Sequence, residues 1–183
     1  MPNWCECELT VTGPEADLTR FKETAREKYP QEGETPRVLD ENSFLPYPAK
    51  FRKKDERRRE WAKENSIGGD PRNGLKEGVS YSDCPKDGFN SGGYEWCIAN
   101  WGTKWGICEP AVVEESPRLA AYTFSCAWGP CLPVIEKMGE MFPTLRFVLN
   151  YYEGGMCFQG TLVVEDGETT HDESREYNGN RGG

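Results

Sequence analysis

Hydrophobic and polar residues alternate along residues 3–12, which is the pattern of a strand with one buried face. The apolar face carries Cys5, Cys7, Leu9 and Val11. Gly13-Pro14 interrupts the alternation, and proline suits the first turn of a helix because its missing N–H needs no partner there. Leu18, Phe21 and Ala25 follow at helical spacing, so we expect a helix that packs one apolar stripe onto the sheet.

The second half of the chain repeats this combination of strands and helices. The predicted elements are a short helix over 93–102, strands over 104–114 and 119–128, a helix over 130–142, and strands over 146–153 and 156–165. The last two strands are joined by a Gly154-Gly155 turn, which predicts a hairpin. Alternation places Phe124, Cys126 and Trp128 on one strand face. The apolar stripe of the second long helix comprises Leu132, Ile135, Met138, Met141 and Phe142.

Residues 30–93 lack such a period and are rich in Pro and Gly, which indicates an insertion rather than a second core, with one charged helix over 52–65. Residues 166–183 are polar and Gly-rich, so we expect a flexible tail. The order β-α-β-β-α-β places both helices on one face of an antiparallel sheet, the ferredoxin-like α+β arrangement. We therefore predict a single domain over 1–165, with a large insertion after the first helix and an extra C-terminal edge strand.

Composition narrows the class of protein. The chain has 183 residues, with 22 Lys or Arg against 31 Asp or Glu, so its net charge of −9 repels phosphate backbones and anionic membranes on average. No apolar run approaches the roughly 20 residues that span a bilayer, and the N-terminus has no signal-peptide pattern. We expect a cytoplasmic protein that does not contact membranes and whose eight cysteines are reduced.

Four stretches resemble the YubB-like ferredoxin-like family of plasmid and phage proteins: MPNWCECELTVTG, GYEWCIANWGTKW, TFSCAWGPCLPVIEKMGEMFP and LNYYEGGMCFQGTLVVEDG. Within the insertion only FLPYP aligns. The resemblance implies a ferredoxin-like fold and a mobile-element or prophage origin, and it implies no particular activity. The fold name describes topology alone, since the chain has no C-x₂-C-x₂-C run that would bind an iron–sulfur cluster.

Motifs for catalysis or for a cofactor are missing from the sequence. The pairs Cys5/Cys7 and Cys126/Cys131 lack the spacing of zinc ligands, so we interpret them as buried thiols and expect no metal. A Cys or Ser nucleophile needs a base, and the single histidine, His171, falls in the predicted tail. We expect no cofactor and no catalytic residue, although the acidic residues leave a catalytic carboxylate pair open.

Trp96, Trp101 and Trp105 lie close together in the sequence and suggest either core or a binding surface. We expect Cys97 and Trp101 to point inward, which leaves Asn100, Thr103, Lys104 and Trp105 as the functional edge. A ligand pocket between insertion and sheet would be lined by Tyr47, Trp96, Trp101, Lys104 and Trp128.

Two further surfaces are candidates for nucleic-acid contact. The helix-free sheet face would carry Trp4, Thr10, Thr123, Ser125 and Gln159, and bases can stack on such a face. Glu6 and Glu8 on the same face argue against a phosphate track. The charged helix contains Arg57, Arg58 and Arg59, which we interpret as a solvated face rather than as a nucleic-acid or acidic-partner contact.

The charge, the missing motifs and the resemblance together favour a non-enzymatic interaction module. It would bind a host or phage protein through an acidic surface, and imitation of DNA phosphates in counter-defence would be one instance. Two alternatives stay open: a small-ligand-binding or catalytic domain with the aromatic pocket, and a binder of single-stranded nucleic acid on the open sheet face. The sequence leaves the oligomeric state undetermined.

Overall fold

The computed structural model describes residues 3–28, 30 and 35–179 of the chain. It divides into two compact units, and each is described by itself. The first unit comprises residues 1–46 and 97–183, and the second comprises Tyr47–Trp96. The predicted insertion over 30–93 thus begins too early, because Leu39 and Phe44 are buried in the core of the first unit. Residues 31–34 of that insertion lie outside the described part of the chain.

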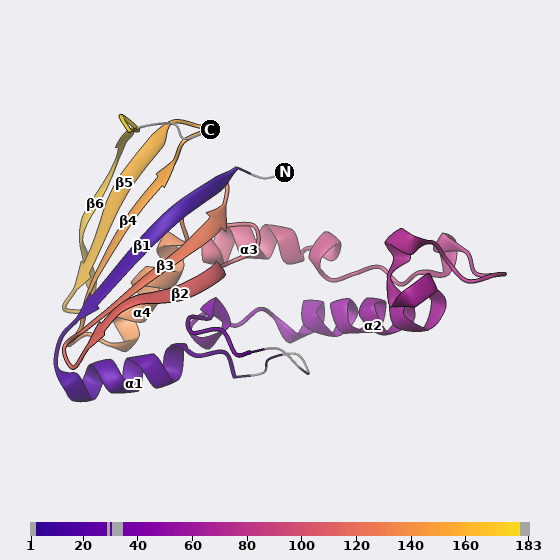
Figure 1. Cartoon of the computed structure of the whole chain (residues 1–183), viewed down its shortest axis with the longest axis horizontal. Helices are drawn as coiled ribbons and strands as arrows, with labels where there is room; N and C mark the ends of the chain where they lie inside the picture. The colour runs from indigo at the N-terminus through magenta and orange to yellow at the C-terminus, as the bar shows by residue number, and fades with distance from the viewer. Residues whose placement is uncertain (1–2, 29, 31–34, 180–183) are drawn as a thin grey trace. The chain divides into compact units, whose positions relative to one another are not determined.

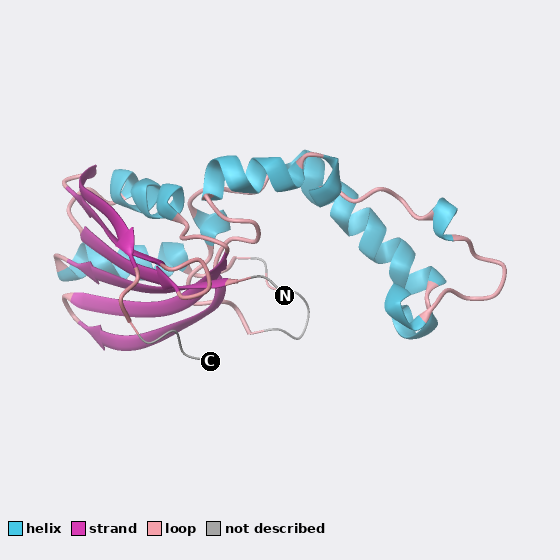
Figure 2. Cartoon of the chain, turned by 90° about the horizontal axis from the view of Figure 1, so that it is seen from above, coloured by secondary structure: helices cyan, strands magenta, loops and turns pink. Residues whose placement is uncertain are grey.

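One antiparallel sheet of six strands forms the first unit, in the order β2-β3-β1-β4-β5-β6 (Figure 1). The strands are β1 (Trp4–Thr12), β2 (Cys108–Ser116), β3 (Leu119–Ala127), β4 (Arg146–Glu153), β5 (Phe158–Glu165) and β6 (Glu168–Glu176). With α1 (Glu15–Ala25) and α4 (Leu132–Met141), the first four make a β-α-β-β-α-β core. Figure 2 shows the strands as one twisted layer.

The core of the first unit centres on Phe21 of α1. Its ring lies 5.4 to 6.3 Å, centroid to centroid, from the rings of Phe44, Tyr122, Phe142 and Phe147. The predicted helix stripe of Leu18, Phe21 and Ala25 is confirmed, because all three side chains are buried. Cys5, Cys7, Leu9 and Val11 of β1 are buried as well, so the helices cover this face and the other face of the sheet is open.

A buried ion network holds the segment that leads into β2. Arg37 Nη2 lies 2.5 Å from Asp40 Oδ1, and Arg37 Nη1 lies 3.3 Å from Glu41 Oε2. The same Glu41 oxygen accepts the Ile107 N–H at 3.1 Å. Gly106 has a φ of 71°, and a Cβ there would meet the Glu41 carboxyl group. Burial raises the pKa of Glu41 to about 7, although the charge of Arg37 lowers it.

Several expected elements differ from those observed. The prediction of a flexible tail from residue 166 is wrong over Glu168–Glu176, which form β6, so two strands rather than one extend the core and β6 is the edge. Residues 180–183 lie outside the described residues. The strand expected over 104–114 begins only at Cys108, because Gly106 before it has a positive φ; Glu109, with a φ of 51°, lies at the register shift between Cys108 and Ala111 inside β2. Met141, expected in the helix stripe, is exposed at the end of α4.

The second unit is organised around α2 (Ala49–Asn65). Four single turns of 3₁₀ helix follow: Ile67–Gly69, Pro71–Asn73, Tyr81–Asp83 and Phe89–Ser91. Its last residues begin α3 (Gly93–Trp101), and the boundary between the units falls inside that helix. Phe51 is the buried apolar side chain of the second unit among the described residues. Asp55 Oδ1 accepts the N–H groups of Gly88 and Phe89, at 2.7 and 3.1 Å.

Candidate functional site

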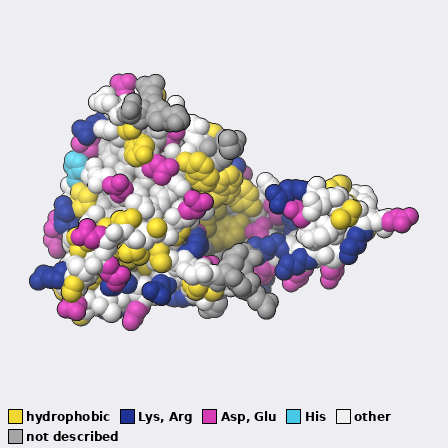
Figure 3. Space-filling view, viewed as in Figure 1, with side chains coloured by type: hydrophobic (Ala, Val, Ile, Leu, Met, Phe, Trp, Pro, Cys, Tyr) yellow, Lys and Arg dark blue, Asp and Glu magenta, His cyan; other side chains and the backbone are white. Residues whose placement is uncertain are grey.

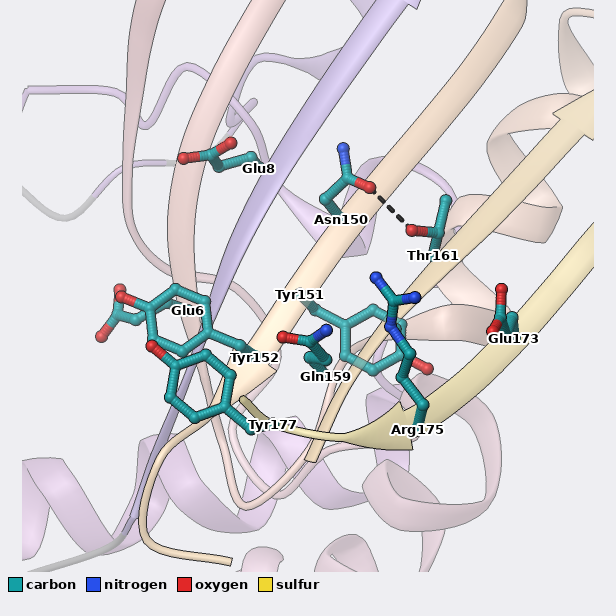
Figure 4. A pocket seen from close by; sticks show the side chains of 11 residues that line it. Glu6, Glu8, Asn150, Tyr151, Tyr152, Gln159, Thr161, Glu173, Arg175 and Tyr177 are labelled. Atoms are coloured by element: carbon teal, nitrogen blue, oxygen red, sulfur yellow. Dashed lines mark hydrogen bonds between the residues drawn. The ribbon is translucent and has the colours of Figure 1, made fainter. Parts of the chain in front are cut away.

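The open sheet face presents two rows of polar residues that cross four strands. Antiparallel register aligns β1, β4, β5 and β6 so that each row takes one residue from every strand. The first row is Glu6, Tyr152, Gln159 and Arg175, and the second is Glu8, Asn150, Thr161 and Glu173. Directly opposite residues have Cβ atoms about 4.5–5.5 Å apart, so the members of each row are neighbours. Tyr177 follows β6 and completes the site, the open-face groove (Figure 4).

Two stacked tyrosine rings form one wall of the open-face groove. The centroids of Tyr152 and Tyr177 are 5.0 Å apart and their planes differ by 10°. Figure 4 shows the Glu6 carboxylate beside the hydroxyl ends of both rings. Desolvation raises the pKa of Tyr152, and the charges of Glu6, Tyr177 and Glu8 raise it further. A carboxylate at the end of an aromatic stack suits a cation, because the carboxylate and the outer ring faces both attract positive charge.

The opposite wall is held by hydrogen bonds between neighbouring strands. Thr161 Oγ1 donates to Asn150 Oδ1 at 2.8 Å. With the Gln159 amide oriented by its neighbours, its oxygen accepts from Arg175 Nε at 2.8 Å and from Nη2 at 3.3 Å. Arg175 is therefore fixed along the edge strand. The backbone of Gly160 lies between Gln159 and Thr161 at the bottom of the groove, and a Cβ there would point to the covered face, where it would collide with the hydroxyl group of Tyr151 and the carbonyl oxygen of Glu173.

The groove is shallow and its lining is acidic. It encloses about 250 Å³ and is lined by three glutamates, Glu6, Glu8 and Glu173, against one cation, Arg175. Figure 3 shows acidic side chains scattered among polar and apolar ones on this side of the first unit. The arrangement has the size of a subsite for one or two side chains and lacks the depth of a cavity that encloses a metabolite.

An aromatic corner adjoins the groove on the same sheet face. The rings of Trp4 and Trp105 lie 6.0 Å apart, and the ammonium group of Lys104 lies 4.6 Å from the centroid of Trp105. Trp4 precedes Glu6 by two residues on β1, so both point to the open face. Trp105 is 41% exposed. The structure thus brings together Lys104 and Trp105 from the predicted edge with Trp4 from the predicted open face.

Other predicted site residues are placed elsewhere. Thr103 is buried and its hydroxyl donates to the Ala127 carbonyl oxygen at 2.9 Å, so it belongs to the core. Cys97 and Trp101 are buried as expected, and the Trp101 indole donates to the Leu45 carbonyl oxygen at 2.8 Å. Asn100, at the end of α3, is half-buried and forms no part of the groove.

The five predicted pocket residues fall in different units. Tyr47 and Trp96 belong to the second unit, where their rings meet edge to face at 5.8 Å, whereas Trp101, Lys104 and Trp128 belong to the first. Trp128 does not share the buried face of Phe124 and Cys126: it has a φ of 72°, follows the end of β3, and is 47% exposed. The alternation ends at Ala127, so extending it by one residue gave the wrong face.

The three consecutive arginines of the charged helix do not form one surface. Successive helical residues point about 100° apart, so Arg57, Arg58 and Arg59 face three directions. Arg58 turns toward its own unit, where Nη1 donates to the Pro85 carbonyl oxygen at 3.2 Å and lies 3.6 Å from Asp87 Oδ2. Arg57 and Arg59 are exposed.

Thiols and the histidine are spread over the described part of the chain. No three His, Cys, Asp or Glu side chains lie where they could hold a metal ion among the residues described. Hydrogen bonding to Cys126 and burial raise the pKa of Cys131 well above its usual value, which disfavours the reactive thiolate. His171 belongs to β6 rather than to a tail, and its Nε2 lies 3.6 Å from Glu173 Oε2 at an exposed position.

The comparisons with known proteins concern the fold. Residues 100–181, slightly less than half of the chain, match the family model of the ferredoxin-like domain in Api92-like protein. A crystal structure of a protein api92 from Yersinia pseudotuberculosis is similar over 98% of this chain and 99% of that one, with a TM-score of 0.55 and 10% sequence identity. No curated protein sequence matches the chain.

These matches confirm the predicted ferredoxin-like fold at the level of the domain. They extend it over β6, which lies within the matched residues. The narrower resemblance to YubB-like proteins stays a prediction. Neither description names an activity or a partner. Within the residues described, no helix has both the length and the apolar character required to cross a membrane.

Sequence reasoning found only part of the open-face groove. It placed Glu6, Glu8 and Gln159 on the open face and missed every residue that β6 and its continuation contribute. A usable signal was present in Asp166-Gly167, a dipeptide typical of two-residue hairpins. Both residues have positive φ, 54° and 82°, as such a turn requires. Reading this turn would have predicted β6 and, with it, Glu173 and Arg175.

Proposed function

We propose that the protein is a non-enzymatic interaction module that binds a positively charged, extended segment of a partner protein in the open-face groove. The observation that carries the proposal is the Tyr152–Tyr177 stack with Glu6 at its hydroxyl ends, bordered by Glu8. Arginine is the side chain that fits best, because its planar guanidinium stacks on aromatic faces and pairs with carboxylates at once.

The partner segment is expected to be extended because the site itself is a flat grid of strand residues. Successive side chains of a strand repeat every two residues on one face, about 6.8 Å apart. Alternate residues of a bound segment would therefore meet the two rows of the groove in turn. Glu6 and Glu8 are spaced by this same period on β1, so they match two alternate cations of the partner.

A basic, extended segment of a protein that normally binds nucleic acid is one partner of this kind. In its most specific form, the proposal includes a counter-defence role. It also includes the mobile-element origin that the sequence resemblance implies. The counter-defence role is supported by the acidic open face and the net charge of −9, whereas the mobile-element origin is supported by the resemblance alone.

Single-stranded nucleic acid is the competing occupant of the open face. Trp4 and Trp105 with Lys104 offer a stacking platform with one cation. Glu6, Glu8 and Glu173 beside it repel a phosphate chain, so the basic peptide is the better fit. Oligonucleotide binding that is abolished by Trp4→Ala would instead favour this competitor.

The test uses a fluorescein-labelled peptide of alternating arginine and serine, followed by fluorescence anisotropy. The double variant E6Q/E8Q is expected to weaken binding by about tenfold or more, since about 1.4 kcal/mol of lost pairing has that effect. The matched control E15Q/E23Q removes two exposed carboxylates from α1, away from the groove, and is expected to leave affinity within about twofold.

Two results would overturn the proposal. Equal losses of peptide affinity in the two double variants would show that the peptide is attracted by the overall negative charge and not by the groove. Unchanged binding in E6Q/E8Q would exclude the groove as the binding site. A peptide with glutamate in place of arginine serves as the negative probe.

A further inference from the structure

The helix α2 of the second unit carries a basic surface that the proposed function does not use. Eight of its 17 residues are Lys or Arg and four are Asp or Glu. All eight basic side chains are exposed. Their positions around the helix decide whether they act together, because residues three and four apart share a face.

One side of α2 is occupied by contacts inside the second unit. Phe51 is buried, and Asp55 accepts the backbone N–H groups of Gly88 and Phe89. Arg58 reaches the Pro85 carbonyl oxygen at 3.2 Å. These residues follow one another at four and three positions, so they define the inward side of the helix.

A second line of residues, the lysine–tryptophan stripe, runs beside that inward side. It comprises Lys50, Lys54, Arg57 and Trp61, spaced by four, three and four residues, and it contains no acid. From Lys50 to Trp61 it extends about 16 Å along the axis, at 1.5 Å per residue. Neither Lys54 nor Arg57 forms an ion pair within the part of the chain that is described. Trp61 is half-buried, which leaves part of its ring accessible.

The opposite flank of α2 offers a matched comparison. Arg52, Glu56, Arg59 and Lys63 have the same spacing, but an acid stands second and lies 4.0 Å from Arg52. This flank also has three cations, yet one of them has a carboxylate neighbour and no aromatic residue ends the line. The two flanks therefore have the same number of cationic side chains, and they differ in that one carries a glutamate and the other a tryptophan.

We propose that the lysine–tryptophan stripe binds single-stranded nucleic acid, with Lys50, Lys54 and Arg57 on successive phosphates and Trp61 stacked on a base. Cations that track a backbone next to an aromatic stacking platform are typical of single-strand binding. An acidic protein segment would supply no base for Trp61. A duplex groove fits less well, because Glu60 lies nine residues after Phe51 and so opposite the inward side, on the face a groove would receive.

The proposal extends beyond the open-face groove and rests on a different unit of the chain. Its phosphates would approach α2, whereas the acidic face of the first unit would repel them. The two proposals can therefore fail separately. E6Q/E8Q is expected to leave oligonucleotide affinity unchanged or slightly higher, whereas variants in α2 are expected to leave it much lower.

The test measures the anisotropy of a labelled short oligothymidylate at several salt concentrations, using the full chain. The triple variant K50Q/K54Q/R57Q is expected to lower affinity by about thirtyfold or more. Its salt dependence should fall by about two in slope, since each lost single-strand phosphate contact contributes about 0.7. The control R52Q/R59Q/K63Q removes the same charge and is expected to stay within about threefold of wild type.

Trp61 separates stacking from charge. Trp61→Leu is expected to weaken binding by about tenfold without a change in salt slope, because stacking contributes about 1–3 kcal/mol per base. Trp61→Phe is expected to recover most of the affinity. Circular dichroism must show an unchanged helix content in every variant, and amide exchange in α2 provides the second check of folding.

Three results would contradict the proposal: no oligonucleotide binding by the wild type, equal losses in the two triple variants, or tighter binding of a polyglutamate peptide than of the oligonucleotide. The second result would indicate non-specific attraction. The third would identify an acidic protein as the partner of α2.

Discussion

The first unit has 22 Asp or Glu and 11 Lys or Arg residues, whereas the second has nine and 11. The whole negative charge of the chain therefore resides in the first unit. The overall value of −9 hides this division. An expectation drawn from the average, that the surface repels phosphates, describes the open sheet face and fails to describe α2.

The two units also differ in how they are held together. The first has a continuous apolar core around Phe21, covered by two helices. In the second, Phe51 is the buried apolar side chain among the described residues. Its loops are held by hydrogen bonds such as those that the backbone N–H groups of Gly88 and Phe89 donate to the Asp55 carboxylate. The open-face groove of the first unit therefore lies on a sheet backed by a packed core, whereas most side chains of the second unit are at least partly exposed.

The largest expected effect comes from the core of the first unit. Phe21→Ala removes a ring that four other rings contact, and we expect it to lower the free energy of unfolding by about 3–5 kcal/mol. Phe51→Ala in the second unit is expected to cost about 1–2 kcal/mol, because no other apolar side chain among the described residues of that unit is buried with it. Urea denaturation of the two variants measures both values. Equal losses would show that the second unit is packed as firmly as the first.

The free energy of unfolding, measured as a function of pH, distinguishes the buried carboxyl group of Glu41 from the exposed acids. The pKa of Glu41 is about 7 in the folded protein, against 4.5 for an exposed glutamate such as that of the unfolded chain. Between these two pH values the folded state therefore binds one proton more than the unfolded state. Stability should therefore be highest below pH 4.5 as far as this group is concerned, fall as the pH rises to about 7, and then level off. The total change is on the order of 3 kcal/mol.

Glu41→Gln isolates this contribution, because glutamine still accepts the Ile107 N–H and does not ionise. The difference in free energy of unfolding between wild type and variant should slope across this window and be flat outside it. A difference that is constant with pH would mean that Glu41 ionises normally in the fold.

A smaller effect is expected at Gly160 of β5, directly beneath the open-face groove on the covered side of the sheet. Gly160→Ala places a methyl group against Tyr151 and the backbone of β6, and we expect a loss of about 1–3 kcal/mol together with weaker peptide binding. Gly129→Ala is the control, since a Cβ there meets no atom within 4 Å. It is expected to change the free energy of unfolding by less than about 0.5 kcal/mol. Unchanged stability and binding in Gly160→Ala would contradict the close pairing of β6 with β5 beneath the groove.

Strict alternation made the central strands predictable. In β1 and β4 every second residue is buried, so the period of two identifies both the strands and their faces. The same rule fails for β6, whose sequence ETTHDESRE is exposed throughout. An edge strand that covers no core has no hydrophobic period, and only its turn marks it.

Positive backbone φ values account for the other misplacements. Trp128 leaves the face of Cys126 because its φ is 72°, and Glu109 interrupts the start of β2 with a φ of 51°. Tryptophan and glutamate seldom adopt a positive φ, so the sequence does not indicate this conformation at either position. The groove was only partly predictable for a related reason: its rows depend on register between four strands, which the sequence of any one strand does not contain.

We propose above that the open sheet face of the first unit receives a cationic segment. Backbone amide chemical shifts, followed during titration of ¹⁵N-labelled protein with the arginine–serine peptide, test it most directly. We expect the largest shifts at Glu6, Glu8, Tyr152, Gln159 and Tyr177, with the amides of α2 unchanged. Shifts confined to α2, or spread evenly over the exposed acids of both units, would contradict it.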